Sequence, residues 1–150
     1  MPSKATQKSP QQITQLVELM RNLDAKQYQN LLDRLHTEHP SLAEALLDAM
    51  FTFDDLIYLT DRSMQTLLKE LDRPTLTRAL KKVNDELMNK IMNNLSKRAG
   101  ENLLEEMSLL PPTRVSEVME AQREIAKIAR SMEEKGTITI VRPDDDDPLV

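Results

Sequence analysis

The chain has 150 residues, of which 39% are hydrophobic and 30% are charged, and its formal net charge at pH 7 is −5. This composition is typical of a folded chain with one modest domain or two small ones, and the absence of cysteine excludes disulfides and cysteine-ligated zinc. The acidic balance, with two tyrosines, two phenylalanines and no tryptophan, argues against nucleic acid as the main partner. We expect no membrane span, because no apolar run approaches the required length of about 18 residues.

The first predicted unit is a group of three short helices in residues 11–50. Apolar residues recur there every three or four positions, which is typical of helices with one buried face. Asp24 is the predicted N-cap of the second helix, and Pro40 is the predicted first residue of the third. Such a unit normally buries its face by stacking on a neighbour, so a single unit predicts an exposed apolar surface. The polar residues 1–10 are expected to be disordered.

A junction at residues 51–60, with the sequence FTFDDLIYLT, separates this unit from a second group of predicted helices. Both phenylalanines of the chain lie in it. Beyond it, Asp72 and Asn84 are predicted N-caps, and Pro74 lies in a predicted first turn, where it costs no hydrogen bond.

The helix that follows the predicted N-cap Ser96 carries its charges in an unusual order. Helix N-termini favour acids and C-termini favour bases, by roughly 0.3–1 kcal/mol per exposed charge. Here Lys97 and Arg98 open the helix, and Glu105 and Glu106 lie near its end. This order suggests a surface shaped for a charged partner, although many charged helix faces are simply solvated.

Basic residues around this helix form a second pattern. Acidic residues are interleaved with them and aromatic residues are missing, so they make a poor nucleic-acid patch. As half of a charge-complementary protein surface they would set orientation and encounter rate more than affinity, which suits a contact that is made and broken repeatedly. These residues are Lys81, Lys82, Lys90, Lys97, Arg98 and Arg114.

Proline and glycine residues define the predicted helices in the last third of the chain. The proline pair at 111–112 ends the charged helix, and a long helix is predicted from about 116 to 135, with Gly136 as its C′ residue. The run TITIV at 137–141 is β-prone, and it either lies extended on its own domain or adds to another molecule. The tail at 142–150 contains four consecutive aspartates and is expected to be disordered.

Enzyme chemistry finds little support in the sequence. His36 and His39 could form a metal site with Glu38 or Asp33, but two surface histidines near a helix end explain the pattern better. The acids at 144–147 lack the spacing of a calcium loop. No nucleophile elbow and no glycine-rich phosphate loop occurs. We therefore expect a protein that is not an enzyme and that has no metal, cofactor or small-molecule substrate.

Several short motifs then follow one another in a fixed order. Met50-Phe51-Thr52-Phe53 is followed by Asp54-Asp55-Leu56 and then by Asp61-Arg62-Ser63. Further motifs are Ala79-Leu80-Lys81, Asn94-Leu95-Ser96-Lys97-Arg98-Ala99, Pro112-Thr113-Arg114, Glu120-Ala121-Gln122 and Gly136-Thr137-Ile138-Thr139-Ile140. From about residue 12 to 141 this series resembles the C-terminal part of the flagellar motor-switch protein family FliG. The first motif is similar to that family's MFxF hinge, and the third to its DDR[SA] element, with Thr60 in place of the first Asp.

The resemblance implies an all-α fold of two small right-handed, armadillo-like helical subdomains, at residues 11–50 and 51–141. The hinge between them would be formed by Met50, Phe51 and Phe53. The charged helix would be the torque helix, which in this family faces the cytoplasmic loop of the stator protein MotA. The residues that match its stator-contacting charges are Lys81, Lys90, Arg98, Glu105, Glu106 and Arg114.

The first subdomain resembles the armadillo-type unit that packs in this family on a middle domain, often of a neighbouring subunit. Glu38-His39-Pro40 is similar to the motif EHPQR, which contacts the switch protein FliM, but that motif belongs to the middle domain, so its role is not transferred. A FliM contact through an apolar patch of this later unit stays open.

The sequence also departs from the family pattern. Lys82 stands where glycine commonly follows the lysine, and Pro111 replaces the usual glycine of the turn. The 150 residues contain no counterpart of the N-terminal domain, which binds the ring protein FliF, or of the middle domain. We therefore expect a short FliG-like protein.

The expected function is that of a rotor or switch component at the cytoplasmic face of the flagellar basal body. It would contact the stator electrostatically, generate torque and reverse its polarity by rotation about the hinge. The expected partners are a MotA-like stator protein, a FliM-like switch protein, and full-length FliG or a second copy through residues 11–50. The alternative is a FliG-like adaptor or regulator that docks on another motor or envelope-associated protein without generating torque.

Overall fold

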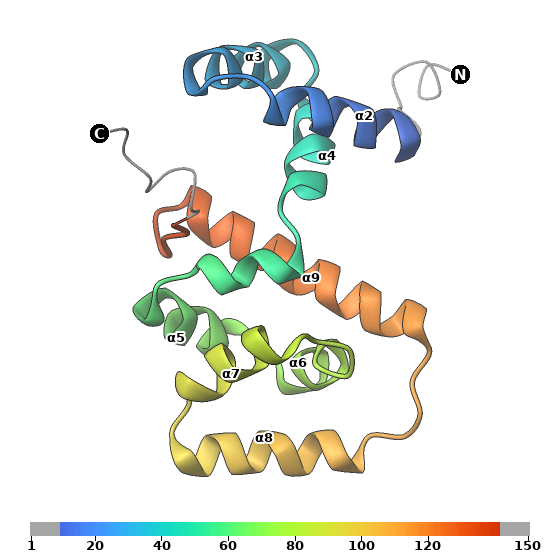
Figure 1. Ribbon diagram of the computed structural model, residues 1–150, viewed down its shortest axis with the longest axis vertical. Helices are drawn as coiled ribbons and strands as arrows, with labels where there is room; N and C mark the ends of the chain where they lie inside the picture. Colours follow the sequence, from blue (N-terminus) through green and yellow to red (C-terminus); the bar gives the residue numbers. More distant parts are fainter. Residues whose placement is uncertain (1–9, 142–150) are drawn as a thin grey trace. The chain divides into compact units, whose positions relative to one another are not determined.

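A computed structural model describes residues 10–141, most of which are helical (Figure 1). The all-α class is confirmed, because the described residues contain no strand beyond one isolated bridge. The chain divides into two compact units, with the boundary between Phe51 and Thr52. The segments 1–9 and 142–150, which we expected to be disordered, lie outside the described residues, whereas Pro10 is the first residue of a helix.

The first unit consists of α2 (Pro10–Arg21), α3 (Ala25–Glu38) and α4 (Pro40–Met50). Asp24 caps α3 as predicted, because its carboxylate accepts the backbone N–H of Gln27 at 2.7 Å. The Gln27 side chain in turn accepts the backbone N–H of Asp24 at 3.3 Å. This reciprocal cap gives partners to two N–H groups that the start of a helix leaves without them.

The core of the first unit lies where α4 packs on both α2 and α3. Its buried members are Val17, Met20, Leu32 and Leu46. The hydrophobic side chains of Leu19 and Leu31 remain exposed, at 64% and 37%. The sequence predicted an exposed apolar surface on this unit.

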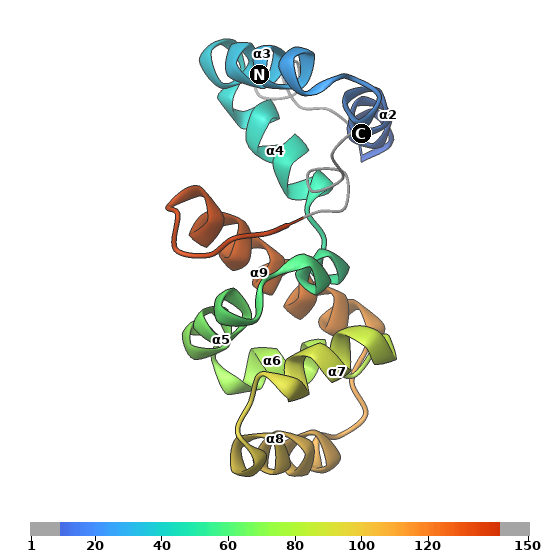
Figure 2. The ribbon, with the colours of Figure 1, turned by 60° about the vertical axis from the view of Figure 1, so that its left-hand side comes forward.

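The second unit begins with the 3-10 helix η1 (Phe53–Tyr58). Its α-helices are α5 (Asp61–Glu70), α6 (Arg73–Ala79), α7 (Asp85–Asn93), α8 (Lys97–Leu109) and α9 (Val115–Glu134). The long helix α9 packs on α6 and on η1, and η1 also packs on α7. In both views α6 and α7 lie between α9 and α8, so α8 forms an outer edge of this unit (Figures 1 and 2).

Four helices of the second unit start at a side-chain cap. Thr60, Asp72, Asn84 and Ser96 each accept the backbone N–H three residues further on, at 2.8–3.1 Å. The predicted caps Asp72, Asn84 and Ser96 are thus confirmed. Thr60 replaces the first Asp of the DDR[SA] element, but its hydroxyl still accepts from the start of α5. Caps of this kind allow helices as short as α6 to begin at a defined residue.

The β-prone run at 137–141 lies on its own unit, which settles the alternative left open by the sequence. Ile140 forms an antiparallel bridge with Leu59. The backbone N–H of Thr139 donates to the hydroxyl of Ser63 at 2.8 Å. Gly136, with φ of 76°, provides the reversal after α9, as its predicted C′ role requires.

Replacing Ser63 with alanine tests how this segment is held. Ser63 is only 6% exposed, and its loss leaves the Thr139 N–H without a partner. We expect the free energy of unfolding to fall by about 1 kcal/mol, the net value of a typical hydrogen bond, because Thr139 is itself exposed, and we expect the Thr139 amide to exchange faster. Ser108→Ala is the control, since its exposed hydroxyl donates only to the Glu105 carbonyl of its own helix. Equal effects of the two variants on Thr139 exchange would contradict the assignment.

The cap of α6 makes a pH-dependent contribution to stability. The Thr75 hydroxyl and backbone N–H both donate to the Asp72 carboxylate, and they hold the pKa of that carboxyl below its ordinary 3.8. A lowered folded pKa stabilises the fold above the unfolded value, and this stabilisation is lost as the pH falls through the folded value. In Asp72→Asn the amide still caps, so the variant isolates the effect of the charge. Urea unfolding should show a wild-type advantage that is constant from about pH 5 to 8 and shrinks below about pH 4; an advantage that grows on acidification would contradict this.

Candidate charged interface on α8

Helix α8 is covered by the rest of its unit on one side only. Leu103 and Gly100 are buried, and a methyl group at Gly100 would meet Cε of Met92 at 2.9 Å, so the end of the Met92 side chain packs on α8 there. The helical spacing of apolar residues predicts that Leu103 shares a buried stripe with Ala99, Met107 and Leu110. These three residues are only half-buried, because α8 lies at the edge of the unit.

The unusual charge order of α8 is present in the folded helix. Its first turn contains no acid and its last turn contains no base. Arg98 and Glu105 are exposed, and neither forms an ion pair with another residue of the described range 10–141. Both ends therefore carry charges that oppose the helix dipole and that are open to an outside partner.

Glu106 is engaged within the unit. Its Oε2 lies 3.4 Å from Nε of Arg73, the first residue of α6, and the two side chains are 44% and 42% exposed. The Oε2 atom itself is shielded from solvent and accepts no hydrogen bond, so this contact is an ion pair with poor hydrogen-bond geometry. Such a half-exposed pair contributes little stability but restricts where Glu106 lies.

The remaining predicted residues come from the elements next to α8. Lys81, in the turn after α6, donates from Nζ to the Pro111 carbonyl at 2.7 Å and lies 3.4 Å from the Thr113 hydroxyl. Arg114 is the exposed N-cap residue of α9, and Lys90 is half-buried in the last turn of α7. The predicted charges thus belong to one unit, but Lys81 and Glu106 already have partners within it.

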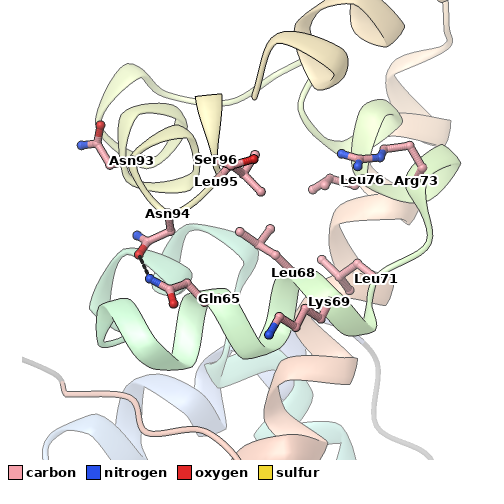
Figure 3. Close-up of a pocket in the computed structure, with 10 residues that line it drawn as sticks. All are labelled: Gln65, Leu68, Lys69, Leu71, Arg73, Leu76, Asn93, Asn94, Leu95 and Ser96. Carbon is pink, nitrogen blue, oxygen red and sulfur yellow. Dashed lines mark hydrogen bonds between the residues drawn. The ribbon is translucent and has the colours of Figure 1, made fainter. Parts of the chain in front are cut away.

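A groove that the sequence did not reveal lies beside α8 (Figure 3). It has a volume of about 690 Å³ and lies among α5, the start of α6 and the connection from α7 to α8. The helical spacing of apolar residues predicts that Leu68 and Leu71 are buried, but both are only half-buried, and they line this groove together with Leu76 and Leu95. Amphipathic spacing cannot distinguish a side chain that faces a filled core from one that faces a hollow.

The predicted hinge residues lie at the boundary between the two units. Met50 ends α4 and packs, partly buried, against the core of the first unit. Phe51 and Phe53 are both buried, and Phe53 starts η1. The backbone N–H of Thr52 donates to the Asp55 carboxylate at 2.9 Å, which fixes the start of η1 just after the boundary.

Within residues 10–141 no three His, Asp or Glu side chains lie close enough to hold a metal ion. The considered site at His36 and His39 therefore lacks a ligand set there, and the acids at 144–147 fall outside that range. Among the described helices, none combines the length and the apolar character that a membrane span requires.

Comparison with known proteins covers both units of the chain. The profile of the FliG C-terminal domain family matches residues 33–140. The chain belongs to this family. The flagellar motor switch protein FliG of Borreliella burgdorferi is 40% identical over 138 residues, which cover 92% of this chain and 40% of the relative. FliG of Thermotoga maritima is 43% identical over 125 residues, which cover 83% and 37%.

Solved structures of FliG show the same fold. The structure of full-length FliG from Aquifex aeolicus matches with a TM-score of 0.72 and 34% identity, over 89% of this chain and 41% of that one. FliG residues 116–343 from Helicobacter pylori match with a TM-score of 0.68 and 35% identity, over 83% and 55%. The armadillo-like helical class implied by the motifs is therefore confirmed. The chain spans about two fifths of the length of the curated relatives it matches.

The charge order of α8 predicts a variant that stabilises the fold. Glu105→Lys places a base near the C-terminus of the helix and turns the like-charge pair with Glu101 into an attractive pair four residues apart. Urea unfolding should show a gain of about 0.5–1 kcal/mol.

Glu106→Lys is the matched control for this variant. The same benefit at the helix end is offset there by loss of the Arg73 pair and by new repulsion from its guanidinium. If Glu106→Lys raised the free energy of unfolding as much as Glu105→Lys, the ion pair between Arg73 and Glu106 would be contradicted.

Proposed function

We propose that this chain acts as a non-enzymatic rotor component of the flagellar motor and that α8 presents the surface on which the stator acts. The observation that carries the proposal is the pair Arg98 and Glu105. Both are exposed, both are unpaired within the described range, and both are placed against the helix dipole. Charges that cost stability and have no partner within the described residues fit a role in binding another protein.

The expected contact is electrostatic and individually weak. Exposed ion pairs are worth about 0.2–1 kcal/mol each, so no single pair would hold the stator in place. Complementary charge mainly steers the encounter and fixes the orientation of the partners. A MotA-like stator loop that presents acids toward Arg98 and bases toward Glu105 and Glu106 would fit this surface. Lys90 and Arg114 extend the positive part of the same surface.

The hinge gives this surface a second orientation. The unit boundary falls within the motif formed by Met50, Phe51 and Phe53, so rotation there would move α8 as part of a rigid second unit. If the second unit turned so that Arg98 and Glu105 met the stator in the opposite order, the force of the stator on α8 would act in the opposite direction. The proposed place of action is the cytoplasmic face of the flagellar basal body.

The first unit is proposed to connect this surface to the rest of the rotor. Leu19 and Leu31 are exposed hydrophobic side chains on α2 and α3. We propose that this unit stacks on full-length FliG or on a second copy, and that a FliM-like switch protein also contacts it.

Charge reversal at Arg98 tests the proposed function in cells whose motility depends on this protein. Arg98→Glu should slow or abolish swimming, and reversal of an acidic residue in the stator loop should restore it, because the attraction is then re-formed with opposite signs. Lys127→Glu, an exposed reversal on α9 of the same unit as Arg98, is the control and should swim normally.

Unchanged swimming with Arg98→Glu would remove the stator proposal. The alternative role, a FliG-like adaptor that generates no torque, would be favoured by two results together. Arg98→Glu would swim normally, and the chain would capture an envelope-associated protein in place of stator or switch proteins.

A further inference from the structure

The last turn of α8 lacks the positive charge that a helix C-terminus favours. It contains no base, and Glu105 and Glu106 lie just before its end at Leu109. The two prolines that follow have no backbone N–H, so they cannot donate a Schellman-type hydrogen bond to the last carbonyls. The end of α8 is therefore electrostatically unfavourable in its own sequence.

A lysine from another element supplies the missing cation. Nζ of Lys81 donates to the Pro111 carbonyl at 2.7 Å, two residues beyond the end of α8. The Thr113 hydroxyl donates to the same carbonyl at 3.0 Å. Lys81 thus places an ammonium group near the negative end of the helix and ties down the connection that leads to Arg114.

The turn that carries Lys81 is itself fixed by the long helix α9. The Gln122 amide donates to the Ala79 carbonyl at 2.9 Å and to the Lys82 carbonyl at 2.6 Å. These two bonds bracket Lys81 and hold its backbone against α9. A continuous set of contacts therefore runs from Gln122 through Lys81 to the connection between α8 and α9.

We propose that Lys81 is a positioning residue rather than a stator contact. It compensates the C-terminal charge of α8 from outside the helix and sets the position of the 110–114 connection. The presentation of Arg114 and Glu105 would then depend on Lys81, whose exposed ammonium donates to the Pro111 carbonyl of its own unit. The motility consequence rests on the proposed function, whereas the structural role does not.

Amide hydrogen exchange on the isolated protein tests the structural role without a stator. The reporters are the Leu110, Glu117 and Val118 amides, which donate to Met107 and Arg114 carbonyls on either side of the connection. Lys81→Met should speed their exchange about tenfold, the factor expected for loss of a hydrogen bond with a charged donor. The Gly100 amide at the other end of α8 should be unaffected.

Two matched variants make this result specific. Lys81→Arg keeps a cationic donor that can reach the same carbonyl and should restore slow exchange. Lys82→Met removes the neighbouring exposed lysine and should change nothing at these amides. Unchanged exchange in Lys81→Met, or an equal change in Lys82→Met, would overturn the proposal.

Suppression genetics separates positioning from contact in cells. We expect Lys81→Met to impair motility and Lys81→Arg to preserve it. No charge reversal in the stator should restore motility to the Lys81→Met strain. A stator reversal should, by contrast, restore motility to the Arg98→Glu strain. Restoration of a Lys81→Glu strain by a stator reversal would show direct contact and would overturn the proposal. Faster exchange in Lys81→Met combined with normal swimming of Arg98→Glu would instead uphold the role of Lys81 and remove the proposed function.

Discussion

The opposition between the charges of α8 and the dipole of that helix is the constraint on which the account of this chain depends. Lys97 and Arg98 lie at the positive end, and Glu105 and Glu106 lie toward the negative end. Each such charge costs a few tenths of a kcal/mol to about 1 kcal/mol. Helix α8 stays folded because Ser96 caps its start, Leu103 is buried and Lys81 compensates its end. These contacts offset the unfavourable free energy of the charges and leave the side chains of Arg98 and Glu105 exposed.

The rest of the second unit serves to hold this edge helix in place. Side-chain caps start α5, α6, α7 and α8 at defined residues, so these helices can be short and still point in fixed directions. The long helix α9 packs on α6, and its Gln122 fixes the turn beyond that helix. A force applied to α8 would therefore reach the whole unit through α6, as the proposed rotor role requires.

Local features of the sequence predicted much of this arrangement. The caps Asp24, Asp72, Asn84 and Ser96 were readable because a cap needs only a short polar side chain and the N–H group three residues later. The charge order after Ser96 predicted the charged helix, and the order of the motifs that resemble FliG predicted the family. Features that depend on distant residues were not readable. Lys81 and Pro111 are 30 residues apart, and the hollow beside Leu68 exists only once α5, α6 and α7 have packed.

The most direct test of the central claim is the salt dependence of binding between this protein and the cytoplasmic loop of the proposed stator partner. If exposed charges on α8 make the contact, the association constant should fall steeply as ionic strength rises. Neutralising Arg98 and Glu105 as Arg98→Gln and Glu105→Gln should flatten that dependence, while neutralising the exposed Lys127 as Lys127→Gln should not. An association constant that is insensitive to salt, or equally sensitive after both charges are removed, would contradict the claim that this helix carries its unfavourable charges for a partner.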